Sequence, residues 1–223
     1  MTRIGVVIFP GSNCEYDALS GVSELGASAD FVWHTETDLA GYDGIILPGG
    51  FAHGDYLRPG ALARFSPVME AIARFAADGG PVLGICNGFQ VLTEAGLLPG
   101  ALQKNRGLTF ICQPTTLIVE STSSVLTSAA TRGQELVVPI NHFSGAYTCS
   151  DETLAELERD DRIVLRYKDN PNGSRADIAG VANAAGNVVG LMPHPERAMS
   201  TLLGSADGRI LLTSFVAAHA TTS

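Results

Sequence analysis

The chain has 223 residues, 45% of them hydrophobic, and a formal net charge of −9 at pH 7. This length and composition predict a substantial core and one compact domain spanning residues 1–223, and they exclude a disordered or fibrous chain. The acidic balance and the lack of any Lys/Arg cluster argue against nucleic acid or an anionic membrane surface as a partner.

The first residues, MTRIGVVIFPGSN, contain one short apolar run that is broken at once by proline and glycine. They lack the features of a signal peptide, and no later stretch approaches the ~18 apolar residues of a membrane span. The cysteines have no CxxC spacing, which fits neither a zinc site nor the disulfide framework of a small secreted protein. We therefore expect a cytoplasmic protein without a metal site. The four cysteines are Cys14, Cys86, Cys112 and Cys149.

Short apolar runs that end in glycine or proline alternate with helix-like segments along the first half of the chain. The runs are RIGVVIF, GIIL and PVLGI. This alternation predicts an α/β fold with parallel strands and crossover helices, and runs that are apolar at every residue predict strands covered on both faces. Between Arg64 and Ala77 apolar residues recur at steps of three and four, which predicts an amphipathic helix.

The second half of the chain begins with a change in amino-acid composition. Residues 108–138 are rich in Thr and Ser, with Pro114 and Gly133 as breakers, and predict extra strands that decorate the main sheet. The segment NVVGLM then predicts another strand. The segment SADGRILLTSFVAAHA predicts a closing helix, with Ser205 as its N-cap.

Cys86 ends the run PVLGI and has a glycine two places away on either side, Gly84 and Gly88. Small neighbours are what a tight strand-to-helix turn needs, so the pattern predicts a nucleophile elbow with Cys in place of Ser. The nearby helix N-terminus would stabilise the thiolate. The alternative is a small buried hydrophobic residue, which is our interpretation of the other three cysteines. Cys14 also precedes a helix after a strand, but lacks the second glycine.

A nucleophilic thiol needs a base, and the base needs an acceptor that orients it. In GLMPHPER the flanking prolines favour extended backbone, which predicts that His194 and Glu196 project to the same side. The alternative for His194 is a histidine that only bonds within its turn. His34 and His219 are expected to face solvent. His53 and His142 lie in glycine-containing loops and could line a pocket, but no carboxylate is placed to orient them.

Attack on a carboxamide also requires donors for the oxyanion. The amide of Asn87, directly after the nucleophile, is one candidate. The other is the turn after GIIL, where Gly49 and Gly50 allow backbone amides to point at a ligand. Its alternative is a plain turn.

The motifs GICNGFQ, PGGFAHGDYLR and MPHPERA together resemble class I glutamine amidotransferases, the Cys-His-Glu glutaminases with a flavodoxin-like, doubly wound, mostly parallel sheet and helices on both faces. Within that class, PGSNCEYD, GDYLRPGA, NPNGS and GNVVGLMPHPERA are similar to glutaminase subunits of phosphoribosylformylglycinamidine synthase. The resemblance covers nearly the whole chain.

The resemblance implies roles for six residues. Cys86 is the nucleophile, His194 the base and Glu196 its orienter, while the amides of Gly50 and Asn87 stabilise the oxyanion. Gln90 helps to hold glutamine.

The same resemblance implies a reaction and its partners. Glutamine forms a γ-glutamyl thioester, water releases glutamate, and ammonia is channelled to a synthetase subunit. That subunit uses ATP and Mg²⁺ to make formylglycinamidine ribonucleotide in purine biosynthesis, and a small bridging subunit completes the complex. No cofactor is implied in this chain, which has no GxxxxGK[ST] loop.

Two segments depart from the family pattern. The chain has INHFSG at residues 140–145 where IAHGEG is expected, so that Ser144 replaces a glutamate, and it has Ala52 and His53 where Ser and Tyr are more familiar. Two other functions compete with this prediction: an independent cysteine hydrolase of similar fold, such as a γ-glutamyl hydrolase, and a noncatalytic docking subunit. The independent hydrolase would act without a synthetase, and the docking subunit predicts lost catalytic groups.

Overall fold

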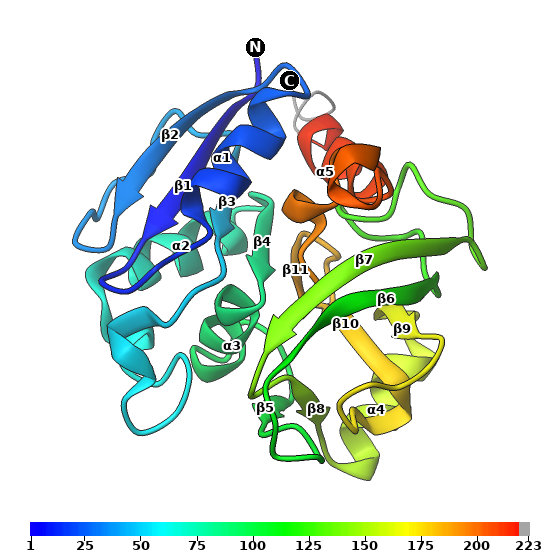
Figure 1. Cartoon of the computed structure of the whole chain (residues 1–223). Coiled ribbons are helices and arrows are strands. Elements are labelled where there is room, and N and C mark those ends of the chain that lie inside the picture. Colours follow the sequence, from blue (N-terminus) through cyan, green and yellow to red (C-terminus); the bar gives the residue numbers. More distant parts are fainter. Residues whose placement is uncertain (219–223) are drawn as a thin grey trace.

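The structure, a computed structural model, describes residues 1–218 (Figure 1). Within this range a nine-stranded sheet has the order β2-β1-β3-β4-β11-β10-β9-β6-β7, and β5 pairs with β8 in a small second sheet. The strands are β1 (Arg3–Ile8), β2 (Ser28–Trp33), β3 (Gly44–Leu47), β4 (Val82–Ile85), β5 (Ala101–Gln103), β6 (Ile111–Val119), β7 (Glu135–His142), β8 (Ala146–Thr148), β9 (Ile163–Tyr167), β10 (Ile178–Ala182) and β11 (Val188–Leu191). The helices are α1 (Glu15–Ser23), α2 (Pro67–Ala77), α3 (Asn87–Glu94), α4 (Asp151–Arg159) and α5 (Gly208–Ala217).

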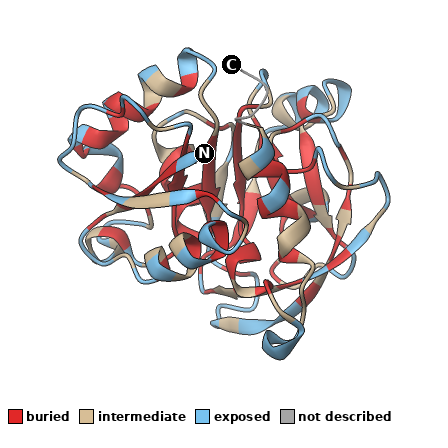
Figure 2. Ribbon diagram, turned by 90° about the horizontal axis from the view of Figure 1, so that it is seen from above, coloured by how far each residue is buried: buried red, intermediate tan, exposed pale blue. Residues whose placement is uncertain are grey.

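One half of the large sheet is parallel. Strands β2, β1, β3, β4 and β11 pair in parallel, as the alternation of apolar runs and helices predicts. Every residue of β3, β4 and β11 is buried, which is the pattern of strands covered on both faces. Helix α1 packs on β1 and β2, and α3 packs on β3, β4 and β11. Figure 2 shows these buried strands in the middle of the molecule, with exposed residues on the surrounding helices and loops.

The other half of the sheet is antiparallel. Strands β10, β9, β6 and β7 continue from β11 by antiparallel pairing. Strands β6 and β7 confirm the extra strands that the Thr- and Ser-rich segment predicts, and the α/β fold with a decorated, mixed sheet is confirmed. Residues of β7 alternate between buried and more exposed, as expected for an edge strand with one solvated face.

Two predicted helix starts are wrong. The helix expected from Arg64 begins at Pro67, because proline suits the first helical position and the residue before it is driven to extended backbone. Phe65 lies in a short 3₁₀ turn and is 71% exposed. The closing helix α5 begins at Gly208 with Asp207 as N-cap, while the Ser205 hydroxyl accepts a bond from the Asp207 amide.

None of the helices within residues 1–218 is long and apolar enough to cross a membrane. The last residues of the segment predicted as the closing helix, including His219, lie outside the described residues.

Candidate active site

Cys86 connects strand β4 to helix α3 in a left-handed backbone conformation, with φ 51° and ψ −104°. Such a conformation is strained for a residue with a side chain, and it persists only where the surrounding structure enforces it. The Cys86 amide donates to the Leu191 carbonyl at 2.8 Å, which ties the turn to the end of β11. The predicted elbow is therefore present.

The two glycines that flank Cys86 allow the helix to sit directly on the sheet. A Cβ atom at Gly88 would lie 1.9 Å from the Leu47 carbonyl oxygen, which is inside any tolerable contact. A Cβ atom at Gly84 would lie 2.6 Å from Leu92 Cδ1 and 2.8 Å from the Gly88 carbonyl carbon. The spacing of glycines in GICNG is thus required by the close approach of α3 to β3 and β4.

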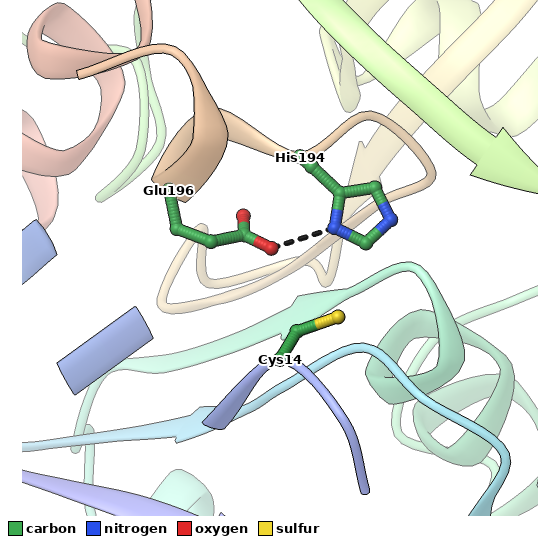
Figure 3. Close-up of side chains that lie close together, drawn as sticks. All are labelled: Cys14, His194 and Glu196. Atoms are coloured by element: carbon green, nitrogen blue, oxygen red, sulfur yellow. Dashed lines mark hydrogen bonds and ion pairs between the residues drawn. The ribbon is translucent and has the colours of Figure 1, made fainter. Parts of the chain in front are cut away.

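His194 and Glu196 follow β11, at the same edge of the sheet as Cys86. Strands β4 and β11 are parallel and in register, with Ile85 opposite Leu191, so their carboxyl ends meet. His194 Nδ1 lies 2.6 Å from Glu196 Oε1, and both side chains are buried (Figure 3). The two residues are brought together as predicted, although the backbone route differs: Pro195–Arg197 form a 3₁₀ turn instead of extended chain.

The electrostatic setting of His194 favours its protonated form. Burial by itself lowers the pKa of His194, but the Glu196 carboxylate and the nearby Cys86 and Cys14 sulfurs raise it, and the resulting pKa lies well above the ordinary 6.5. Nδ1 is occupied by Glu196, whereas Nε2 has no hydrogen-bond partner among the described residues. This ring nitrogen is available to exchange a proton with a thiol or a leaving group.

Of the two candidate oxyanion donors, Gly50 lines the same cavity as Cys86, and Asn87 follows Cys86 directly in the chain without lining the cavity. Gly50 has φ +147°, and a Cβ atom there would lie 2.7 Å from the Asn13 amide nitrogen. Its backbone therefore depends on the absence of a side chain. Asn87 is the first residue of α3, where an amide N–H has no partner within the helix. Both amides are chemically suited to donate to a developing negative charge.

Side chains on and around α3 form a hydrogen-bonded chain beside the elbow. Asn87 Oδ1 accepts from the Ala52 amide at 3.0 Å, and Asn87 Nδ2 donates to Gln90 Oε1 at 2.8 Å and to Asp55 Oδ1 at 3.2 Å. Gln90 Nε2 donates to the Ser144 carbonyl at 2.5 Å. The side chains of Asn87 and Gln90 are thereby fixed against two separate loops.

A cavity of about 680 Å³ lies at the carboxyl ends of the parallel strands. Its walls include Cys86, His194, Gly50 and Gln90, so the structure brings most of the predicted site residues to one space. The volume is ample for an amino acid, and the position agrees with the general rule for open parallel sheets.

Comparison with known proteins identifies the chain's relatives. A family model described as a CobB/CobQ-like glutamine amidotransferase domain matches residues 1–209. The chain belongs to this amidotransferase family. It is 56% identical over 215 residues to phosphoribosylformylglycinamidine synthase subunit PurQ of Rubrobacter xylanophilus, an alignment that covers 96% of this chain and 98% of the relative.

One solved structure agrees with this amidotransferase assignment, and a second shares the fold. The structure of PurLQS from Thermotoga maritima contains a chain that is 44% identical, with a TM-score of 0.90 and coverage of 97% of this chain and 98% of that chain. The glutaminase domain of Trypanosoma brucei CTPS, solved with bound acivicin, is 17% identical, with a TM-score of 0.65 and coverage of 100% and 95%. The second likeness shows a shared fold alone.

The cavity is also lined by a second cysteine, Cys14, which the sequence pattern predicts to be a plain core residue. Cys14 precedes α1, and its sulfur points toward the His194 ring (Figure 3). Gly49 makes room for both groups, because a Cβ atom there would lie 2.7 Å from His194 Cε1 and 3.0 Å from Cys14 Sγ. The segment PGSNCE also forms a turn between a strand and a helix, and this pattern could have predicted that Cys14 lies at the same cavity as Cys86.

Cys14, His194 and Glu196 each offer a possible metal ligand, and these atoms lie within 4.8 Å of one another. Among the described residues this is the single group of that kind. The Arg197 guanidinium lies 3.2 Å from Cys14 Sγ and places a positive charge against any cation that would enter.

The other histidines and cysteines have separate environments. His142 lines the cavity, and its pKa is lowered to about 4 by burial and by the charge of His194. His53 instead approaches Ser66, and its ring lies 5.4 Å from the ring of His34. His34 is half-buried, so the prediction that it faces solvent is wrong. Cys112 is exposed, so its interpretation as a buried residue is wrong.

The departures from the family pattern leave the site's backbone intact. The Ser144 contact to Gln90 uses a carbonyl oxygen, which any residue supplies. The Ala52 contact to Asn87 uses an amide N–H, which is likewise independent of the side chain. Replacement of these two side chains therefore removes no hydrogen bond of the chain around α3.

Proposed function

We propose that this chain is the glutaminase subunit of phosphoribosylformylglycinamidine synthase and that Cys86, His194 and Glu196 are its catalytic residues. The observation that carries the proposal is the buried His194–Glu196 pair, joined at 2.6 Å, at the sheet edge that also holds Cys86 on its strained turn. A noncatalytic docking subunit would have no need to maintain this arrangement. The high identity to a PurQ subunit supports the choice of acceptor enzyme.

Hydrolysis of glutamine on these residues proceeds in two balanced steps. In the first, His194 takes the Cys86 thiol proton, the sulfur attacks the side-chain amide carbon, and the amides of Gly50 and Asn87 stabilise the oxyanion. The tetrahedral intermediate collapses, the C–N bond breaks, and His194 Nε2 gives the proton to the departing ammonia. A γ-glutamyl thioester remains on Cys86.

In the second step water attacks the thioester, and His194 accepts a proton from it. The C–S bond breaks, glutamate leaves, and the proton returns to the Cys86 sulfur. Glu196 holds the imidazole through Nδ1 in both steps, so that Nε2 faces the reacting atoms. Gln90, on the cavity wall beside the elbow, contributes to glutamine binding.

We further propose the setting of the reaction. Ammonia passes to a synthetase subunit that uses ATP and Mg²⁺, and a small third subunit bridges the complex. The whole chain, residues 1–223, forms one amidotransferase domain, which is consistent with a family match over residues 1–209. Its four free cysteines suit a reducing compartment, and we assign the protein to the cytoplasm.

The test is glutamate release from glutamine by the purified chain and its Cys86→Ala variant, each with and without the synthetase and the nucleotide ligands that the synthetase binds. We expect release that depends on the synthetase and disappears in the variant. Equal release by the variant would overturn the catalytic assignment. Full release without any synthetase would instead favour an independent cysteine hydrolase.

A further inference from the structure

The cavity wall has a distinctive distribution of charge. Asp55 is the single acidic side chain among the described residues that line it, whereas Arg58, Lys104 and Arg197 are basic. Free glutamine carries an ammonium and a carboxylate on its α-carbon, away from the carboxamide that reacts. A site that selects this amino acid from other amides needs an acceptor for the ammonium group.

The surroundings of Asp55 suit a carboxylate that binds a cationic group of a ligand. Its side chain is half-buried, and burial raises its pKa to about 6 although the Asn87 hydrogen bond lowers it. Within residues 1–218 it forms no ion pair, because the neighbouring Arg58 is held by Glu94 through contacts of 2.5 and 2.6 Å. An unpaired carboxylate in a partly buried wall is unfavourable unless a bound ligand compensates it.

The backbone around Asp55 is held in an unusual conformation. His53, Asp55 and Leu57 all have positive φ, at 53°, 52° and 69°. Several non-glycine residues in the left-handed region within one short loop indicate strain that the surroundings enforce, and such strain gathers at ligand-binding sites. The enforcing contacts include the Ala52 amide on Asn87 Oδ1 at 3.0 Å.

Asp55 is also connected directly to the reacting residue. Asn87 follows Cys86 in the chain, and its Nδ2 donates to both Asp55 and Gln90, at 3.2 and 2.8 Å. A ligand whose carboxamide lies at Cys86 therefore has Asp55 on the wall of the same cavity, joined to the elbow by one side chain.

We propose that the Asp55 carboxylate binds the α-ammonium group of glutamine and so makes this site specific for α-amino acid amides. This inference rests on the proposed function and deepens it. Asp55 is a specificity-determining residue here, separate from the groups that make and break bonds.

The test compares glutamine with glutaramate, the same amide without its α-amino group. Binding is measured by calorimetry on the full chain carrying Cys86→Ala, so that neither ligand is turned over, with the synthetase and its nucleotides present. Asp55→Asn is then added. Asparagine keeps the shape and tolerates left-handed backbone, so the loop is preserved. We expect glutamine binding to weaken about 10- to 150-fold, the range of a charge-assisted hydrogen bond, and glutaramate binding to change less than about twofold.

Asp161→Asn is the matched control. Asp161 is also partly buried, also has positive φ, at 53°, and accepts a hydrogen bond at 2.7 Å, from the Ser121 hydroxyl, but it lies outside the cavity. Its variant should bind both ligands like the parent chain.

The outcomes separate the two proposals. If the Asp55→Asn change weakens both ligands equally, or neither, the ammonium assignment is wrong even where the intact chain hydrolyses glutamine. If the chain binds neither ligand and releases no glutamate with its synthetase, the proposed function itself fails. Selective loss of glutamine binding supports both.

Discussion

The molecule has two strand-to-helix turns that carry a cysteine to the same cavity, and they differ in backbone conformation. Cys14 lies between β1 and α1 with φ −112° and ψ 14°, whereas Cys86 lies between β4 and α3 with φ 51°. Both residues are buried, at 4% and 6% exposure. Burial and position in the sheet therefore do not distinguish them, but backbone strain does.

Close packing around the turn accounts for the difference. The helix after Cys86 is pressed so tightly on the sheet that Gly84 and Gly88 have no space for a Cβ atom. At the corresponding places around Cys14 stand Ser12 and Tyr16, and Tyr16 is 68% exposed. A strained, crowded turn holds its side chain in one direction. A nucleophile needs this fixed direction, whereas a neighbouring thiol that forms no bond to the substrate does not.

The largest expected effect is the loss of Cys86, the proposed nucleophile. Cys86→Ala should lower synthetase-dependent glutamate release by about 10⁴-fold or more, since it removes the sulfur that is proposed to form the thioester. Cys14→Ala leaves the bond-forming groups in place and should lower it about tenfold or less. Steady-state glutamate assays on both variants make the comparison. A larger loss from Cys14→Ala than from Cys86→Ala would reverse the roles of the two turns.

The next effect concerns His194, the proposed base, which lies beside both cysteines. Glu196→Gln should lower glutamate release by roughly 10²- to 10⁴-fold, because the imidazole loses the acceptor that fixes its orientation and charge. It should also bring the pKa of His194 down, as followed by NMR titration of the ring nitrogens. Glu120→Gln, near Arg166 at 3.8 Å, is a surface control that should change neither quantity.

The same variant has a consequence for stability against pH. In the folded protein the pKa of His194 is raised above the ordinary 6.5, so the folded state holds this proton more tightly than the unfolded state. The stabilisation is complete below that ordinary value and is lost as pH rises through the folded pKa. Glu196→Gln should make the free energy of unfolding less dependent on pH in this range, as measured by denaturant titrations at a series of pH values. An unchanged dependence on pH would contradict the coupling between His194 and Glu196.

A smaller effect tests the crowding at the elbow. Gly88→Ala forces a Cβ atom against the Leu47 carbonyl and should reduce the free energy of unfolding by about 3 kcal/mol, as overpacking against backbone does. Gly107→Ala meets only Thr109 Oγ1 at 3.4 Å and should cost less than about 1 kcal/mol. Denaturant unfolding compares the two. Equal losses would show that the elbow is not unusually tight.

The smallest expected effect lies at the Cys14 turn. Arg197 Nε pairs with Asp17 Oδ2 at 3.0 Å, and both side chains are partly exposed, at 33% and 45%. Such pairs contribute little, so a double-mutant cycle of Arg197→Gln and Asp17→Asn should give a coupling energy of about 0–1 kcal/mol. A coupling of several kcal/mol would mean that the Cys14 turn is held as rigidly as the elbow.

Sequence reasoning found the parts of the molecule where local pattern and chemistry agree. The apolar runs of β1, β3, β4 and β11 are unbroken. The turn at Cys86 is recognisable from its two flanking glycines, which the close packing of the helix on the sheet requires. The pairing of His194 with Glu196 was predicted on the assumption of extended backbone, yet it forms through a 3₁₀ turn. A separation of two residues was sufficient for the contact in either conformation.

What the sequence did not predict depends on distant contacts. Strands β9 and β10 and helix α4 were not singled out, because the antiparallel half of the sheet lacks the strict alternation of strand and helix. Cys14 and Asp55 reach the cavity only through the folding of separate segments. The N-cap predicted at Ser205 is instead Asp207, since a single cap residue is weak evidence beside tertiary packing.

The side chain of Asn87 has a bearing on how this site could be redesigned. Its carbonyl is bound to the loop at Ala52, and its amide is shared between Asp55 and Gln90. A change at any one of these positions alters the partners available to the others, so their mutational effects should not add. Engineering toward other amides is therefore best pursued with libraries that vary Asp55, Asn87 and Gln90 together, since stepwise substitution would pass through intermediates with a broken network.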